Sequence, residues 1–235
     1  MVAGDGFDRY RPSPVGEMLR DRPPMVRELP LFDPDLAPAE PGPLFVDWLV
    51  QAFEAGVLDP QVMTLSTVDA DGVPDARALV LRDVDAAEGT WVFAGEADSP
   101  KGRQLALSPM AALSVYWPPL GRQVRVRGAV EAAPPGVSAD EFRGRSPGAK
   151  VSSLVGRQSE PLGSLAAYDL AADEAQLLLE TDPELVAAGH TVYTLRAAEV
   201  EFWQGDPGRR HVRLRYTRTG PGIGRAAWTS TLLWP

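Results

Sequence analysis

Between residues 62 and 132 the chain repeats short runs of alternating apolar and polar residues, and turn-forming residues separate the runs. A period of two is the pattern of a half-buried β-strand. The turns are short, and Asp69-Ala70-Asp71-Gly72 is typical of a β-hairpin. The strands expected here cover residues 62–68, 74–82, 91–95, 110–117 and 122–132. Sequential antiparallel strands with short connections favour a closed or split β-barrel, so the predicted fold class is β-rich α+β.

Helices and further strands flank this stretch. Leu44 to Phe53 carries apolar residues at helical spacing, with Pro43 suited to the helix start and Gly56 to its end. Ser138-Ala139-Asp140-Glu141 has the pattern of a capping box that opens a helix. Further helices are expected at 151–158 and 171–180, further strands at 191–195, 199–204 and 211–218, and a hairpin turn at 220–224. The helices are expected at the periphery of the barrel.

Residues 1 to 40 differ from the rest, because they are rich in Pro, Asp and Arg and lack a periodic apolar pattern. Such a composition predicts a mostly mobile N-terminal arm. Within it, Leu29-Pro30-Leu31-Phe32 can dock on the body, either as a cover for an active site or as part of a simple tail. Residues 41–235 are expected to form a single domain.

Composition excludes several function classes. The 235 residues include no Cys and only two His, so thiolate and His-rich metal sites are excluded and no metal is expected. The net charge of -9 argues against a nucleic-acid partner. No run reaches the roughly 18 apolar residues of a membrane span, and the N-terminus lacks the order of a signal peptide. We therefore expect a cytoplasmic protein that has no membrane or nucleic-acid partner.

The residues from Ser99 to Leu105 carry the signal of an anion site. Ser99 suits the N-cap of a helix, and Pro100 suits its first turn. A helix N-terminus with Lys101 beside it is a ready phosphate site. Arg77 and Arg82, on the strand before, can add forked donors to the same anion. An ordinary strand–helix–strand unit with surface basic residues is the alternative.

The most specific motif is Glu201-Phe202-Trp203-Gln204-Gly205, which Arg209-Arg210-His211-Val212-Arg213 follows after a short turn. Here the chain resembles the pyridoxamine 5'-phosphate oxidase family of FMN-binding split barrels, whose pattern is E-F-W-Q-G, a turn, and R-x-H-x-R. The resemblance extends in consistent order through residues 77–82, 99–101, 122–124 and 157–159, and it covers roughly Leu44 to Tyr216.

This resemblance implies an FMN-binding split β-barrel with peripheral helices and a homodimer with FMN at its interface. Arg77, Leu79, Val80, Arg82, Lys101 and Gln123 would bind FMN from one chain. Gln158, Ser159, Trp203 and Arg213 would complete the site, some of them from the partner chain; core packing is the alternative role for Trp203.

The sequence departs from the family at the substrate. In the vitamin-B6 oxidases a Lys, a Tyr, an Arg and a Ser hold the substrate phosphate, and the matching residues here are Arg82, Glu141, Arg145 and Ala149. Other residues that differ near the flavin are Ala94, Gly95 and Pro100. A carboxylate close to a phosphate dianion is unfavourable. The resemblance therefore implies a kept flavin site and a changed substrate site.

The flavin oxidases of phenazine biosynthesis resemble this chain most within the family, on Ser99-x-Lys101-Gly102-Arg103 and on Ser152-Ser153-x-x-x-Arg157-Gln158-Ser159. The predicted function is an FMN-dependent oxidase of a small anionic nitrogen heterocycle, with oxygen as electron acceptor. Arg209 and His211 are the expected catalytic residues, and the expected substrate-binding residues are Arg82, Arg145, Arg209, Arg210 and His211. The alternatives are a pyridoxamine/pyridoxine 5'-phosphate oxidase and a non-catalytic flavin- or haem-binding module.

Overall fold

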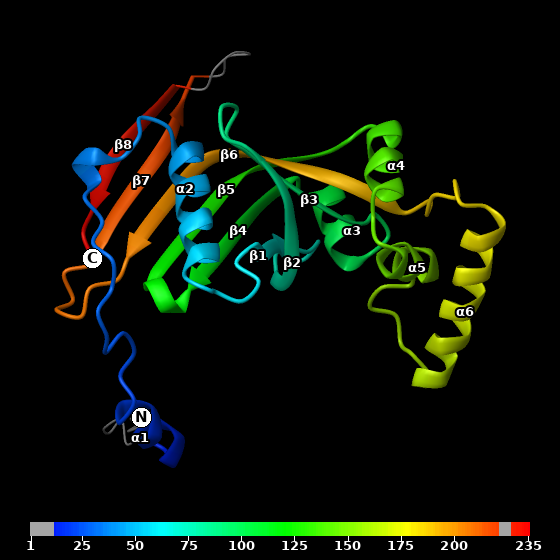
Figure 1. Cartoon of the computed structure of the whole chain (residues 1–235), viewed down its shortest axis with the longest axis horizontal. Coiled ribbons are helices and arrows are strands. Elements are labelled where there is room, and N and C mark those ends of the chain that lie inside the picture. The colour runs from blue at the N-terminus through cyan, green and yellow to red at the C-terminus, as the bar shows by residue number, and fades with distance from the viewer. Residues whose placement is uncertain (1–11, 221–226) are drawn as a thin grey trace, which may run out of the picture.

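A six-stranded antiparallel barrel forms the body of the protein in the computed structural model, which describes residues 12–220 and 227–235. The barrel strands are β1 (Val62–Val68), β2 (Pro74–Asp85), β3 (Thr90–Glu96), β4 (Met110–Trp117), β5 (Arg122–Ala132) and β6 (His190–Gln204). They are ordered β3-β2-β1-β4-β5-β6, and pairing of β3 with β6 closes the barrel. β7 (Val212–Thr219) and β8 (Ala227–Leu233) extend the sheet beyond β6 (Figure 1). The predicted split-barrel fold is confirmed.

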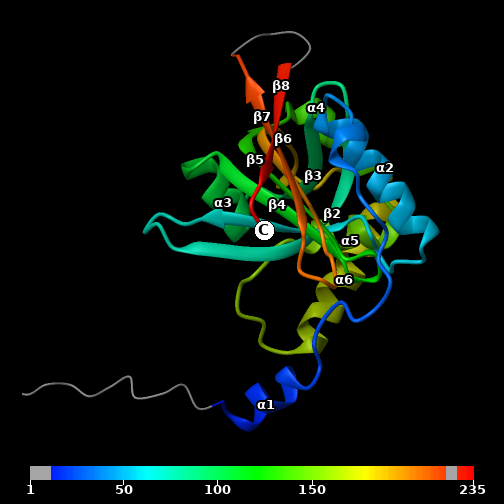
Figure 2. The same cartoon turned by 90° about the vertical axis from the view of Figure 1, so that its left-hand side faces the viewer.

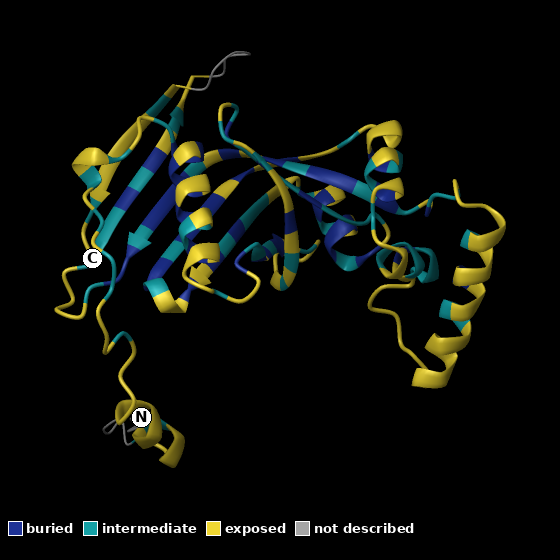
Figure 3. Cartoon of the chain, in the orientation of Figure 1, coloured by how far each residue is buried: buried dark blue, intermediate teal, exposed yellow. Residues whose placement is uncertain are grey.

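The barrel core is aromatic and continues under helix α2 (Pro41–Glu54). Phe45 of this helix packs edge-on against Trp91 at 5.5 Å between ring centroids, and Trp48 packs against Phe202 at 5.2 Å. All four side chains are almost fully buried, whereas the outer face of α2 is exposed (Figure 3). The helical spacing of these residues therefore reflects core packing, as expected.

The segment before α2 lies on the barrel. Phe32 packs edge-on against Trp48 at 5.1 Å, and the Tyr216 hydroxyl donates a hydrogen bond to the Pro38 carbonyl at 2.7 Å. A short 3-10 helix, η1, covers Pro34–Leu36. Helix α1 (Pro14–Arg20) has no buried residue and stands away from the barrel (Figure 2). The docking of residues near Phe32 thus occurs, while a mobile arm over residues 1–40 stays a prediction.

Three helices gather at the start of β6: α4 (Pro135–Arg143), α5 (Pro147–Val155) and α6 (Leu165–Thr181) (Figure 1). The capping-box prediction at Ser138 is wrong. Pro135 begins α4, since proline suits the first helical position, so Ser138 lies inside the helix. Its hydroxyl instead accepts a hydrogen bond from the Val192 N–H at 3.1 Å and ties α4 to β6. Helix α5 also ends earlier than expected, at Val155, because Gly156 takes a positive φ of 59°.

The strands expected at 191–195 and 199–204 are one continuous strand, β6. It pairs with β3 along its first half, with β5 along nearly all of it and with β7 along its second half. A register shift at Arg127/Gly128 of β5 absorbs the irregular middle of β6, which the sequence pattern placed outside a strand. The expected turn at 220–224 lies mostly outside the described residues. Two smaller elements complete the fold, α3 (Pro100–Leu107) and η2 (Pro118–Leu120).

Candidate active site

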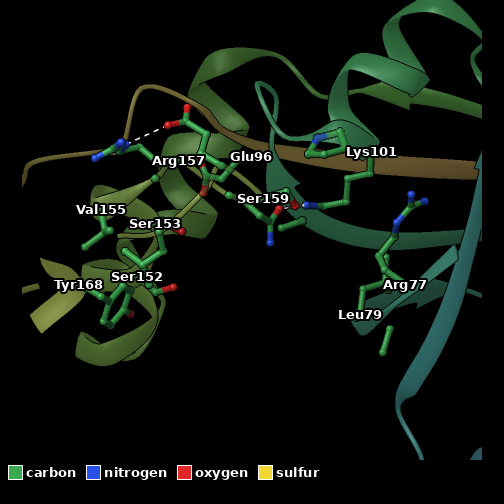
Figure 4. A pocket seen from close by; sticks show the side chains of 18 of the residues that line it. Arg77, Leu79, Glu96, Lys101, Ser152, Ser153, Val155, Arg157, Ser159 and Tyr168 are labelled. Atoms are coloured by element: carbon green, nitrogen blue, oxygen red, sulfur yellow. Dashed lines mark hydrogen bonds and ion pairs between the residues drawn. The ribbon is translucent and has the colours of Figure 1, made fainter. Parts of the chain in front are cut away.

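A cavity of about 870 Å³ lies between the barrel and helices α5 and α6. This volume is in the range of ligand sites, which span roughly 300–1,000 Å³. On the barrel side, Arg77, Leu79 and Lys101 face it, and on the helical side, Val155 and Tyr168 do (Figure 4). We call it the Lys101 cavity. Several predicted site residues line it: Arg77, Leu79, Val80, Arg82, Lys101, Arg145, Gln158 and Ser159.

Lys101 is buried at the start of α3 and has neutral partners. Ser99 is the N-cap, as expected, and its hydroxyl accepts hydrogen bonds from Gly102 N–H at 3.3 Å and from Lys101 Nζ at 3.0 Å. Lys101 Nζ also donates to Gln158 Oε1. Burial lowers the pKa of Lys101 below its ordinary value, since a low dielectric disfavours the charged form. The charge of Glu96 acts in the opposite direction on this pKa. Because its hydrogen-bond partners among the described residues are neutral oxygens, the buried ammonium group is available to an incoming anion.

Gly95 lets Lys101 take this position. A Cβ on Gly95 would collide with Cε of Lys101. Glycine at this point therefore allows the Lys101 side chain to approach β3 closely. Gly95 also lines the cavity.

Arg77 is oriented by three side chains. Its guanidinium group donates to Thr67 Oγ1 at 2.5 Å, to Gln104 Oε1 at 3.0 Å and to Asp75 Oδ2 at 2.5 Å. The hydrogen bond from Gln104 and the charge of Arg77 lower the pKa of Asp75 below its usual range. Sequence reasoning did not find Gln104 or Thr67, because their role depends on β1 and α3 lying side by side.

Gln158 and Ser159 lie in the loop after α5, where the backbone is unusual. Arg157 and Ser159, on either side of Gln158, have φ of 55° and 72°. Positive φ is uncommon outside glycine and tends to cluster at ligand sites. This loop brings Gln158 to Lys101 of the same chain.

A second group of charges lies at the edge of the cavity around Glu141. Arg82 Nε is 3.6 Å from Glu141 Oε1, and His190 Nε2 is 2.5 Å from Glu141 Oε2. Arg145 donates to Ser153 Oγ at 2.6 Å and lies 3.3 Å from His190 Nδ1. Arg82, expected to join Arg77 on one anion, is thus paired with a carboxylate. Sequence reasoning did not find His190; its only signal was that it is one of two histidines in the chain.

The remaining predicted residues lie at the other end of β6, which we call the Trp203 end: Gln123, Trp203, Arg209, Arg210, His211 and Arg213. Trp203 is the register partner of Gln123 on one side and of Arg213 on the other, and its ring lies 4.9 Å from that of His211. Arg213 donates to Glu201 Oε1 at 2.9 Å, and Arg209 is exposed with a φ of 64°.

One chain does not bring the two groups together. His190, at the start of β6, contacts Arg145 beside the cavity, and Trp203 lies thirteen residues further along the same strand. At 3.3 Å per residue the length of strand between them is about 40 Å. Gln123 does not line the Lys101 cavity, because β5 places it beside Trp203, so its expected place with Arg77 and Lys101 in one FMN site stays a prediction. The described residues contain no cluster of three potential metal ligands and no helix long and apolar enough to cross a membrane.

The fold and the cavity define a split-barrel protein with a cationic ligand site, and the comparisons give its family. Residues 49–179 match the pyridoxamine 5'-phosphate oxidase family. Residues 190–235 match the pyridoxine 5'-phosphate oxidase C-terminal dimerisation region. The chain belongs to the pyridoxamine 5'-phosphate oxidase family.

Relatives of two kinds resemble the chain. The pyridoxine/pyridoxamine 5'-phosphate oxidase of Maricaulis maris is 39% identical over 87% of this chain and 88% of its own, and that of Nitrobacter hamburgensis is 36% identical over 84% and 90%. Among solved structures, PhzG from Burkholderia lata 383, in complex with tetrahydrophenazine-1-carboxylic acid, superposes with a TM-score of 0.78. It is 28% identical, and the match covers 88% of this chain and 99% of that one.

The family binds FMN, and the Lys101 cavity fits this cofactor. A phosphate group needs converging donors, and Lys101, Arg77 and the first turn of α3 supply them around one cavity. The cofactor is therefore FMN, and the chain is an FMN-dependent oxidase.

Proposed function

We propose that the protein oxidises a small, flat, carboxylated nitrogen heterocycle of the phenazine type. The observation that carries this proposal is the cavity wall beside Lys101, which consists of Ala94, Gly95 and Pro100. The side chains of Ala94 and Gly95 are small, which leaves room in the cavity for a three-ring compound beside the cofactor. The likeness to PhzG, whose structure holds a tetrahydrophenazine carboxylic acid, supports the same class of substrate.

The cofactor residues of the Lys101 cavity would hold FMN at its phosphate end. Lys101 and Arg77 would contact the phosphate, and the backbone at Leu79 and Val80 would line the flavin ring. Gln158 and Ser159 would cover the cofactor near the start of α3, where Gln158 contacts Lys101. When bound, FMN supplies the redox chemistry, since it accepts a hydride from the reduced ring and passes the electrons to oxygen.

A homodimer would complete the site. Gln123, Trp203 and Arg213 lie at the Trp203 end and do not line the cavity, so they would reach FMN from a second chain. The match of residues 190–235 to a dimerisation region supports this arrangement, because that region contains the Trp203 end.

The partner chain would also supply the substrate-positioning residues. Arg209 and Arg210 are exposed, and their side chains make no ion pair within the described residues. A planar guanidinium group is suited to a carboxylate on a flat ring. His211 packs on Trp203 and its Nδ1 accepts from the Asp206 N–H at 3.0 Å, so its Nε2 is left to contact the substrate. The proposal assigns no obligatory base.

The second candidate is a pyridoxamine/pyridoxine 5'-phosphate oxidase. The identity of 39% to the Maricaulis maris enzyme favours it. The replacement of the family's Tyr and Ser by Glu141 and Ala149 opposes it, because two hydroxyl donors are lost.

An anaerobic screen with the FMN-loaded protein separates the two candidates. Bleaching of the flavin absorbance is followed after addition of a dihydrophenazine carboxylate, pyridoxamine 5'-phosphate or pyridoxine 5'-phosphate. We expect fast bleaching with the first compound and poor turnover of the other two. Efficient oxidation of pyridoxamine 5'-phosphate at micromolar concentration would contradict the first candidate and support the second, a pyridoxamine/pyridoxine 5'-phosphate oxidase.

A further inference from the structure

Arg82 and His190 contact one carboxylate, that of Glu141, and Arg145 lies against His190. Arg82 approaches Glu141 Oε1 to 3.6 Å from β2, and His190 contacts Oε2 at 2.5 Å from β6. Arg145 lies against the other nitrogen of His190 at 3.3 Å. A pocket of about 460 Å³ opens onto Arg82, Glu141 and Arg145, so this group of charges faces a space that a ligand can enter.

The hydrogen bonds assign the donors and acceptors of the group. Arg145 can only donate, so His190 Nδ1 accepts and its Nε2 carries the hydrogen that is donated to Glu141. Glu141 therefore accepts a hydrogen bond from the imidazole N–H through Oε2, and its Oε1 faces the charge of Arg82. The His190 side chain is fully buried, which holds this arrangement in place.

Glu141 is in consequence a resident anion of the pocket. Two arginines that face a ligand space would ordinarily attract an acid group. Here one of the two positive charges is balanced by Glu141, and Glu96, 3.9 Å from His190 Nδ1, is a second carboxylate close by. An incoming phosphate dianion would compete with a carboxylate that is attached to the same chain and would be repelled by it.

We propose that Glu141 is a specificity-determining residue that fills the anion site of Arg82 and Arg145 and thereby excludes phosphorylated substrates. This inference rests on the proposed function only in that the substrate enters next to the Lys101 cavity. The acid group of the substrate is then a carboxylate bound by the arginines of the Trp203 end, while Arg82 and Arg145 carry no substrate charge.

A purely structural role is the competing explanation. In that case Glu141 would only join α4 to β6 through His190, and removing its charge would change stability but not ligand preference. The two roles differ in one respect: an occupied anion site gains affinity for phosphate when its own anion is removed. Arg145 Nε is buried without a hydrogen-bond partner in the described part of the chain, so donor capacity remains for such a gain.

The test compares 4-deoxypyridoxine 5'-phosphate with 4-deoxypyridoxine, by titration calorimetry on the oxidised, FMN-loaded protein. Neither compound is oxidised, so the readout does not depend on turnover. The ratio of the two affinities reports the contribution of the phosphate.

Glu141→Gln keeps the acceptor for His190 and removes the charge, and Glu141→Tyr is a second variant in case the first does not fold. Asp140→Asn is the matched control: it removes one charge from the same pocket, but Asp140 pairs with Arg143.

We expect the phosphorylated compound to bind the wild type and Asp140→Asn no more than about threefold better than the unphosphorylated one. In a folded Glu141 variant this preference should rise at least tenfold. A wild-type preference above thirtyfold, or no gain in either Glu141 variant, would overturn the inference. If a dihydrophenazine carboxylate does not bleach the flavin, the proposed function is wrong, but the role of Glu141 can still be confirmed by the two affinities. If the flavin is bleached and no Glu141 variant gains preference for the phosphorylated compound, the proposed function stands and the role of Glu141 is wrong.

Discussion

The Lys101 cavity and the Trp203 end carry the same kinds of side chain but present them differently. At the cavity, Lys101 is buried and hydrogen-bonded to neutral oxygens of Ser99 and Gln158. At the Trp203 end, Arg209 and Arg210 are exposed on a loop. A buried cation with neutral partners is prepared for a permanent ligand, whereas exposed cations suit a ligand that comes and goes. The difference agrees with the proposal that Lys101 of the cavity binds the cofactor, while Arg209 and Arg210 of the Trp203 end position the substrate.

Inside the cavity, the basic residues differ in the charge of their partners. Arg82 lines the cavity as Lys101 does, yet its partner is the Glu141 carboxylate. Arg77 also has a carboxylate partner, Asp75, but it lines the same cavity as Lys101, whose hydrogen-bond partners are neutral oxygens. Converging cations therefore do not by themselves identify an anion site, because a carboxylate such as Glu141 competes with a further anion.

The largest effect is expected at the Trp203 end. Arg209→Ala should slow flavin bleaching by a dihydrophenazine carboxylate at least a hundredfold, because the guanidinium group that orients the carboxylate is lost. FMN should stay bound. The matched control is Arg196→Ala, which removes an exposed arginine from the middle of β6. Stopped-flow measurements on both variants check this; equal rates in both would remove Arg209 from the site.

The next largest effect is expected at the cavity. Lys101→Met should weaken FMN by about 1.5–3 kcal/mol, or roughly tenfold to 150-fold, through loss of a charge-assisted hydrogen bond. Arg77→Ala should have a similar effect. Lys150→Met, at the only other lysine, is the control. FMN titrations of the apoproteins measure these affinities, and unchanged values in both cavity variants would place the phosphate elsewhere.

Mixed dimers test whether the two regions meet across an interface. Lys101→Met and Trp203→Ala chains should each bind FMN poorly as homodimers, since every site would have one damaged half. A mixed dimer should recover about half of its sites at wild-type affinity, because one site then combines two intact halves. FMN binding by differently tagged, co-purified chains gives the stoichiometry. No recovery would mean that each chain builds its own site.

The sequence predicted those parts of the molecule that depend on local signals. Ser99, Pro100 and Lys101 act as expected because capping and first-turn preferences are local. The turn at Asp69 formed as predicted, since its carboxylate accepts from the Asp71 and Val73 N–H groups.

What the sequence did not predict depends on long-range packing. The contact of His190 with Glu141 spans 49 positions, and Gln104 reaches Arg77 across 27. Ser138 fits the capping-box pattern, but the Pro134-Pro135 pair started the helix earlier and β6 took its hydroxyl. The position of Gln123 required the register of β5 against β6, which a strand pattern does not contain.

The smallest predicted effect is a dependence of FMN affinity on pH. Burial lowers the pKa of Lys101 below its ordinary 10.5, so the apoprotein loses this proton at a lower pH than a free lysine does. FMN affinity should therefore fall a few-fold as pH rises through the lowered pKa.

The stability of the apoprotein should instead increase as pH rises toward 10.5, because the unfolded chain binds this proton more tightly than the folded chain does. In Lys101→Arg the guanidinium group stays charged, and both trends should flatten. FMN titrations and thermal melts of the apoproteins from pH 7 upward measure the two trends, and parallel curves for wild type and Lys101→Arg would show that Lys101 does not carry the pH dependence.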